Sequence, residues 1–362
     1  MADNDAPPAS QIPDLPILQA LGDRRSIRYF DPSREVERWK IETMLQAARF
    51  ASCQGNINAT EAIVVRRDEC DAWDELEECV SGFNVQIINQ ASHLILWLTN
   101  INTWYGRAVD GISGLSLVGA ATKYHGWNYE FSMTQTIPRL MSFPPERTEI
   151  LLRFETGQAV ANAIAAGVGV GVGNILIAFG RKPGGVEKAM GLPPNYKFTW
   201  GHAVGYPLED AKAGGQRPRL RFERLFHDNA LGTPFECQPS TVEMLRSKGL
   251  IQEQAPVAGR VEEITRLAGE HGRDPGLLAF PAAEIRRLMA DEDWDFGPNI
   301  RARAEQVLAE EDLPEYPEEM RETFMRLAAE HGIDATKFLP GEGPGSRPGH
   351  PRDDAARGGT AT

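Results

Sequence analysis

The chain has 362 residues, of which 41% are hydrophobic and 25% charged, a composition typical of a soluble globular protein. This length is sufficient for one large domain with an appendage or for two ordinary domains. The net charge of −13 argues against a general nucleic-acid binder or a protein of anionic membrane surfaces, but it allows a local cationic pocket. No stretch approaches the roughly 18 consecutive apolar residues that a membrane-spanning helix needs.

The first ten residues lack the apolar core of a signal peptide, and we expect a cytoplasmic protein. The cysteines do not have the spacing of a zinc site and are expected to be reduced thiols; they are Cys53, Cys70, Cys79 and Cys237. We therefore expect no metal.

A cationic cluster follows the first predicted helix, which covers residues 15–21. Over residues 26–30 polar and apolar side chains alternate, which predicts a half-buried strand. Guanidinium groups form paired hydrogen bonds with phosphate oxygens and stay charged, so the cluster fits an anion-binding site. The alternative is a basic edge that is simply solvated. The residues concerned are Arg24, Arg25, Ser26 and Arg28.

A polar loop over residues 52–58 separates a predicted amphipathic helix, 36–51, from a predicted strand, 62–65. Its amides, Asn56 and Asn58 among them, can donate and accept hydrogen bonds toward a heteroaromatic ring or a ribityl chain. A simple helix cap followed by a turn is the alternative.

The pattern of residues 71–90 predicts a further helix, and that of residues 93–98 predicts a buried strand. From residue 100 to 145 the pattern is irregular and aromatic. Such a segment fits either a lid over a ligand or a helical pair that packs on a dimer partner.

A long apolar helix, 150–166, runs into alternating glycines and valines that include Gly169 and Gly171. This order, helix before strand, is the reverse of a dinucleotide fingerprint, so we discount a Rossmann site. Glycines here would let a flat ligand lie against backbone N–H groups, or would simply let a helix end pack on a sheet. Strands are predicted over 175–179 and 202–207.

Taken in order, these features resemble the FMN-dependent nitroreductase-like flavoproteins. The resemblance covers roughly residues 14 to 229 and rests on the segments 24–30, 45–49 and 52–58, the helix before Gly167, Gly191-Leu192-Pro193, Gly205-Tyr206-Pro207, and Arg219 before 226–229. It implies an α+β fold in which a mixed sheet is flanked by helices, here with a helical C-terminal extension. It also implies an intertwined homodimer with FMN at the interface.

The resemblance implies a nitroreductase-like FMN-binding domain over 13–235. The residue pattern predicts a helical extension over 236–340, and composition predicts disordered ends at 1–12 and 341–362. It places the FMN phosphate on Arg24, Arg25, Ser26 and Arg28, joined by Arg219. Asn56 matches the family's loop asparagine beside the flavin, whereas Asn58 stands where the family usually has glutamine. Gly169 and Gly171 match the segment that offers backbone N–H groups near the flavin.

The activity that the resemblance implies is a ping-pong oxidoreductase. NADH or NADPH would be the donor, and the acceptor a small nitroaromatic, quinone or similar conjugated compound. Specialised family chemistry stays open as an alternative: flavin fragmentation, reductive dehalogenation or heterocycle dehydrogenation. So does a flavin-binding protein that acts on a partner through its extension. No residue is assigned a catalytic role.

The extension contains a short internal repeat: residues 266–274 resemble residues 326–334. Each copy predicts a helix that is ended by glycine, followed by an aspartate that can cap the next helix. His271 and His331 fit last-turn residues at the negative end of each helix rather than metal ligands.

Overall fold

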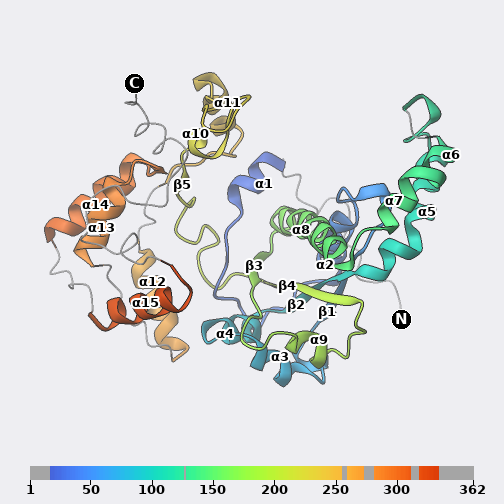
Figure 1. Ribbon diagram of the computed structural model, residues 1–362. Coiled ribbons are helices and arrows are strands. Elements are labelled where there is room, and N and C mark those ends of the chain that lie inside the picture. The colour runs from blue at the N-terminus through green and yellow to red at the C-terminus, as the bar shows by residue number, and fades with distance from the viewer. Residues whose placement is uncertain (1–16, 126–127, 255–258, 273–280, 311–317, 334–362) are drawn as a thin grey trace. The chain divides into compact units, whose positions relative to one another are not determined.

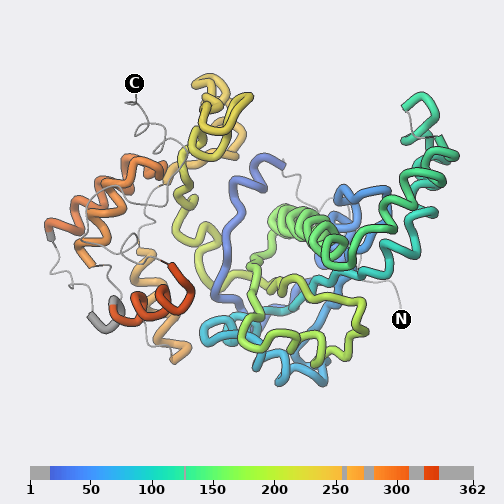
Figure 2. The backbone as a smooth tube through the Cα atoms, viewed as in Figure 1, coloured from blue at the N-terminus to red at the C-terminus, as the bar shows by residue number. Residues whose placement is uncertain are grey.

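The computed structural model describes residues 17–125, 128–254, 259–272, 281–310 and 318–333. It divides into two compact units, Met1–Ala213 and Gly214–Thr362 (Figures 1 and 2). No helix in the described ranges is both long and apolar enough to cross a membrane. The predicted limits of the FMN-binding domain and of the extension remain predictions, and the predicted disordered ends, 1–12 and 341–362, lie outside the described residues.

A four-stranded sheet is the centre of the first unit. The strands are β1 (Thr60–Val65), β2 (His93–Asn100), β3 (Gly173–Ile177) and β4 (Tyr196–Gly205), in the order β1-β2-β4-β3. All three pairings are antiparallel. The four strands predicted downstream of the amide loop are thereby confirmed; β1, β2 and β3 differ by two residues at their ends, whereas β4 begins six residues before its predicted start.

Helices cover both faces of this sheet (Figure 1). One layer consists of α2 (Arg38–Arg49) and α8 (Pro145–Gly169), and the other of α3 (Trp73–Cys79), α4 (Phe83–Gln90) and α9 (Gly185–Ala189). Strand β2 is buried along its whole length, because its side chains alternate between the two layers. Ile95 and Trp97 pack in the α2–α8 core, and Leu94 and Leu96 pack in the other.

The predicted helix over 71–90 is two helices, α3 and α4. The chain breaks between them at Gly82, whose φ of 30° is accessible mainly to glycine. The first predicted helix is α1 (Ile17–Asp23), which continues past its predicted end at residue 21. A further short turn is η3 (Arg67–Glu69).

The aromatic segment 100–145 is helical rather than irregular. Helix α5 (Ile101–Leu117) leaves β2, and the chain returns to α8 through η4 (Lys123–His125), α6 (Tyr129–Phe131), η5 (Ser132–Thr136) and α7 (Ile137–Met141). Trp104, Ile112 and Leu140 give this helical arm a small core of its own. Figure 1 shows the arm projecting from the first unit beside α8.

The second unit is mainly helical, as predicted for the extension. Its elements are β5 (Arg219–Leu220), α10 (Phe222–Leu225), α11 (Pro239–Ser247), α12 (Arg260–Glu270), α13 (Ala282–Ala290), β6 (Trp294–Asp295), α14 (Pro298–Glu310) and α15 (Glu318–Glu330). The repeated motif forms the ends of α12 and α15. His271 and His331 directly follow these helices, and Gly272 and Gly332 have φ values of 64° and 67°, so the glycine stops are confirmed. The capping aspartates, Asp274 and Asp334, lie outside the described residues.

Candidate functional site

The cationic segment, residues 24–30, lies along edge strand β3. Ser26 forms a parallel bridge with Asn174 of β3. Burial alternates from Ser26 to Tyr29 as predicted, but Phe30 is also fully buried. The segment is therefore extended without being a regular strand of the sheet.

A carboxylate supplements the few backbone hydrogen bonds that tie this segment to β3 and to the chain after β4. The backbone N–H groups of Arg28 and Tyr29 both donate to Oε1 of Glu209, the second at 3.1 Å. Glu209 is only 4% exposed. A buried carboxylate that accepts two backbone N–H groups fixes the segment as the hydrogen bonds of a neighbouring strand would. It does so within the stretch that carries the arginines.

The three arginines of the segment have different surroundings. Arg25 is 6% exposed, and its guanidinium donates to the carbonyl oxygens of Gly22 at 2.7 Å and Lys212 at 3.1 Å. Arg24 and Arg28 are half-buried. Arg28 donates to the Ser26 carbonyl at 3.2 Å, and no carboxylate among the described residues forms an ion pair with it. Arg25 thus ties α1 to the chain after β4, whereas Arg28 keeps donors for an anion.

Gly169 and Gly171 stand at the same corner as the cationic segment, where α8 ends before β3. Gly169 is the last residue of α8, and a Cβ built on it would have no atom within 4 Å. Gly171 has a φ of 77°, and its N–H donates to the Val168 carbonyl at 3.0 Å. Gly169 therefore leaves space at this corner, while Gly171 turns the chain out of the helix.

The predicted amide loop contains a short 3-10 turn, η2 (Gln54–Asn56), just before β1. Gly55, Asn56 and Asn58 have left-handed φ values of 61°, 57° and 54°, which glycine and asparagine tolerate best. The Asn58 side-chain amide donates to the Asn56 carbonyl at 3.0 Å. Both asparagines are exposed, so their side chains lie together at the surface.

A buried carboxyl group lies next to the amide loop. Glu155 of α8 is 5% exposed, and its Oε1 accepts the Gln54 N–H at 2.7 Å. Burial raises the pKa of Glu155, opposed by that hydrogen bond. Burial also raises the pKa of the Cys53 thiol, and an ionised Glu155 would add to this shift. Sequence reasoning missed Glu155, whose signal is a single acidic residue in an apolar helical stretch.

The two parts of the predicted site lie at diagonally opposite corners of the sheet. The cationic segment joins β3 at Asn174, which pairs with Val204 near the end of β4. The amide loop leads into Thr60, whose partner Thr99 pairs with Lys197 near the start of β4. Three strand spacings give about 14 Å, and the length of β4 from Lys197 to Val204 adds about 23 Å. One chain therefore does not bring the loop amides to the cationic segment.

Arg219 belongs to the second unit, where β5 pairs with β6. It is exposed, and its guanidinium donates to the Pro218 carbonyl at 3.4 Å. Its predicted role beside the phosphate stays a prediction.

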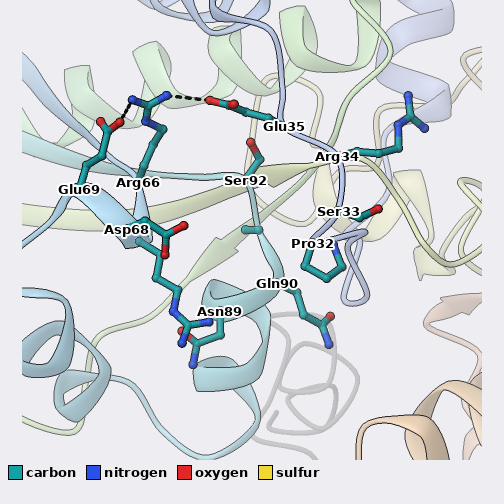
Figure 3. A pocket seen from close by; sticks show the side chains of 12 residues that line it. Pro32, Ser33, Arg34, Glu35, Arg66, Asp68, Glu69, Asn89, Gln90 and Ser92 are labelled. Carbon is teal, nitrogen blue, oxygen red and sulfur yellow. Dashed lines mark hydrogen bonds and ion pairs between the residues drawn. The ribbon is translucent and has the colours of Figure 1, made fainter.

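An open cavity of about 380 Å³ also occurs in the first unit, between residues 32–35, 66–69 and 89–92 (Figure 3). Arg66 forms ion pairs there with Glu35, at 2.7 Å, and with Glu69. None of the predicted flavin-binding residues lines the cavity. Because these charges are paired with one another, we do not assign the candidate site to it.

The fold and the corner at β3 define a nitroreductase-like protein of the α+β class. The model described as "Nitroreductase family" matches residues 21–206, more than half of the chain. The chain belongs to the nitroreductase family, which confirms the resemblance recognised in the sequence.

Solved structures are similar to the chain. One, a protein of Exiguobacterium sibiricum classed as a nitroreductase and solved in complex with FMN, is 16% identical with a TM-score of 0.50, over 60% of this chain and 99% of that one. A nitroreductase family protein of Streptococcus pneumoniae is 17% identical with a TM-score of 0.44, and the match covers 54% of this chain and 92% of that one. A nitroreductase-like protein of Streptococcus mutans is 20% identical with a TM-score of 0.44, and the match covers 53% of this chain and 89% of that one. No curated protein matches the chain.

Proposed function

We propose that the protein is an FMN-dependent oxidoreductase of the nitroreductase family. The observation that carries this proposal is the corner at β3, where Ser26 joins the sheet and the Arg28 guanidinium forms no ion pair with a carboxylate of the described residues. A phosphate dianion needs several cationic or N–H donors to offset the loss of its hydration. Arg24, Ser26 and Arg28 would supply them, joined by Arg219. The Exiguobacterium protein, which binds FMN in its structure, is in line with this ligand.

Arg25 would contribute indirectly. Its guanidinium already donates to backbone carbonyls on both sides of the segment. We therefore divide the four predicted phosphate residues into Arg24, Ser26 and Arg28, which would face the ligand, and Arg25, which would hold them in place.

We further propose that the working unit is a homodimer in which each site is shared. Because the amide loop and the cationic segment lie at diagonal corners of one chain, a second copy related by a two-fold axis would supply the missing half. A surface for this contact exists on α8. Ile150 and Phe154 are 73% and 67% exposed, and the exposed Gly157 and Ala161 continue the same face of the helix.

FMN, when bound, supplies reversible hydride and electron transfer. The chain would bind and orient it: the cationic segment would hold the phosphate, Asn56 and Asn58 would contact the ring or ribityl chain, and Gly169 would leave room at the corner of the cationic segment. The helical arm would limit which acceptors reach the site. We propose NADH or NADPH as donor in a ping-pong reaction, a nitroaromatic, quinone or similar conjugated acceptor, and a cytoplasmic location.

The test is an absorption spectrum of the purified full chain, followed by addition of NADH or NADPH. We expect flavin absorption that one of the pyridine nucleotides bleaches, with steady turnover on adding a nitroaromatic or a quinone. A colourless protein that takes up no added FMN would refute the proposal. Bound flavin without turnover would instead favour a specialised flavin reaction.

A further inference from the structure

Glu155 has one oxygen without a partner. Its Oε1 accepts the Gln54 N–H, but Oε2 is buried and has no hydrogen-bond partner among the described residues. The neighbouring Thr156 fixes this part of α8 against the sheet, because its hydroxyl group contacts those of Thr99 at 2.9 Å and Thr60 at 3.2 Å. The carboxyl group is therefore held at the start of β1, against the backbone of the amide loop.

Within the described part of the chain, no cation forms an ion pair with Glu155. Arg153, two residues earlier on α8, is engaged with Glu149 at 2.8 Å and with the Phe198 carbonyl at 2.9 Å. On the neighbouring elements, Glu61 of β1 accepts hydrogen bonds from Asn100 and Tyr196, and Arg107 and Asp110 of α5 are exposed. Cys53, near the start of the loop, has a half-buried thiol whose pKa is raised chiefly by burial.

This arrangement suits an uncharged carboxyl group. A buried carboxylate without a cation and with a single N–H donor costs much more than a buried neutral acid. Burial accordingly raises the pKa of Glu155. In the neutral form the carbonyl oxygen still accepts the Gln54 N–H, so the loop stays attached to α8.

We propose that Glu155 is a positioning residue for the flavin: as a neutral carboxylic acid it holds the amide loop so that Asn56 and Asn58 are presented to the ligand. This inference rests on the proposed function. When Glu155 ionises, the buried charge draws water or moves toward solvent, and the loop is no longer held in one place. Flavin affinity then falls as the pH rises.

Because burial raises the pKa of Glu155 above its usual value of 4.5, the experiment compares the FMN affinity of the wild type, Glu155→Gln and Glu155→Ala from about pH 5 to about pH 8, by flavin fluorescence. Glutamine keeps an uncharged carbonyl acceptor, so we expect Glu155→Gln to bind FMN within about twofold of the wild type at the lower pH and to lose less affinity as the pH rises. Glu155→Ala should bind about tenfold more weakly throughout. Glu149→Gln, a half-buried carboxylate of the same helix, is the matched control and should follow the wild type.

The proposal is overturned if Glu155→Gln binds as weakly as Glu155→Ala at every pH, because the charge itself would then matter. It is also overturned if the wild type and Glu155→Gln share one pH profile. A second measurement does not need flavin: the amide signal of Gln54 in the apoprotein should titrate in the wild type and not in Glu155→Gln. A titrating Gln54 amide in a protein that binds no FMN would refute the proposed function while keeping the Glu155–loop link.

Discussion

A Cβ atom on Gly111 would lie 2.2 Å from the carbonyl oxygen of Gly55. Helix α5 of the arm and the amide loop therefore meet backbone to backbone, and the same Cβ would lie 2.9 Å from the carbonyl oxygen of Asn56. Only glycine allows this approach. The position of the loop thus depends on the arm as well as on Glu155.

Replacing Gly111 by alanine should displace the loop. We expect Gly111→Ala to lower the free energy of unfolding by about 1–3 kcal/mol and to weaken FMN binding, because the loop carries Asn56 and Asn58. Gly106→Ala on the same helix is the control. A Cβ there has no atom within 4 Å, so we expect a change of no more than about 1 kcal/mol, toward higher stability. Urea unfolding and FMN titration measure both effects, and equal behaviour of the two variants would contradict the close approach.

The double variant Arg24→Ala/Arg28→Ala should lose FMN while it keeps its fold. Removal of two charge-assisted contacts to a phosphate is expected to weaken binding by about 100-fold or more. Arg38→Ala/Arg49→Ala removes the same charge from exposed positions of α2 and should leave the affinity unchanged. Unchanged affinity in the first variant would remove the phosphate assignment.

Arg25→Ala should behave differently, with its main effect on stability. The substitution leaves several carbonyl oxygens without their charged donor, so we expect a loss of at least about 2 kcal/mol in the free energy of unfolding. The exposed Arg38, paired with Glu42 on the surface, is the comparison, and Arg38→Ala should cost no more than about 1 kcal/mol. A fully stable Arg25→Ala protein that cannot bind FMN would show that Arg25 contacts the phosphate after all.

His202 should make the fold sensitive to acid. It is fully buried between strands, stacked 6.5 Å from Trp97, and burial lowers its pKa from 6.5 to about 3. Between these values the unfolded chain binds the proton and the folded chain does not, so this contribution to stability falls as the pH falls below 6.5. Urea unfolding at about pH 7 and pH 5 should show that the wild type loses up to about 2 kcal/mol more than His202→Leu. Equal losses would mean that His202 is accessible to protons in the folded state.

Charges on the exposed face of α8 should separate the proposed dimer. We expect the wild type to sediment as two copies and Ile150→Glu/Phe154→Glu as one, because carboxylates would be buried in an apolar contact. The variant should also lose FMN, since each proposed site needs both chains. Arg38→Glu, an exposed change on α2, is the control and should keep the wild-type mass. A wild type that sediments as a single copy and still binds FMN would refute the shared site.

Local patterns in the sequence predicted much of the fold. The strands, the long helix and the glycine stops at Gly272 and Gly332 follow from periodicity and turn chemistry, which are properties of neighbouring residues. The conformation of the cationic segment was harder to predict, because the backbone N–H groups of Arg28 and Tyr29 donate to Glu209, about 180 positions further along the chain. Alternating burial alone does not distinguish a strand from a segment held by a side chain.

The candidate site shows the same limit. Its chemical components, arginines and loop amides, were recognisable from residue types and from the family pattern. Their placement depends on the strand order β1-β2-β4-β3, which pairs segments far apart in the chain. Spacing in the sequence does not reveal tertiary contacts. It therefore shows neither the different hydrogen-bond partners of Arg25 and Arg28 nor the contact of Glu155 with the Gln54 N–H.

The diagonal placement of the amide loop and the cationic segment has a genetic consequence. In the proposed dimer, one chain that lacks the arginines and another that lacks the loop amides would together assemble one intact site and one doubly damaged site. Two alleles that are each inactive alone would then restore part of the activity when expressed in the same cell. Two alleles damaged in the same half of the site would not complement each other.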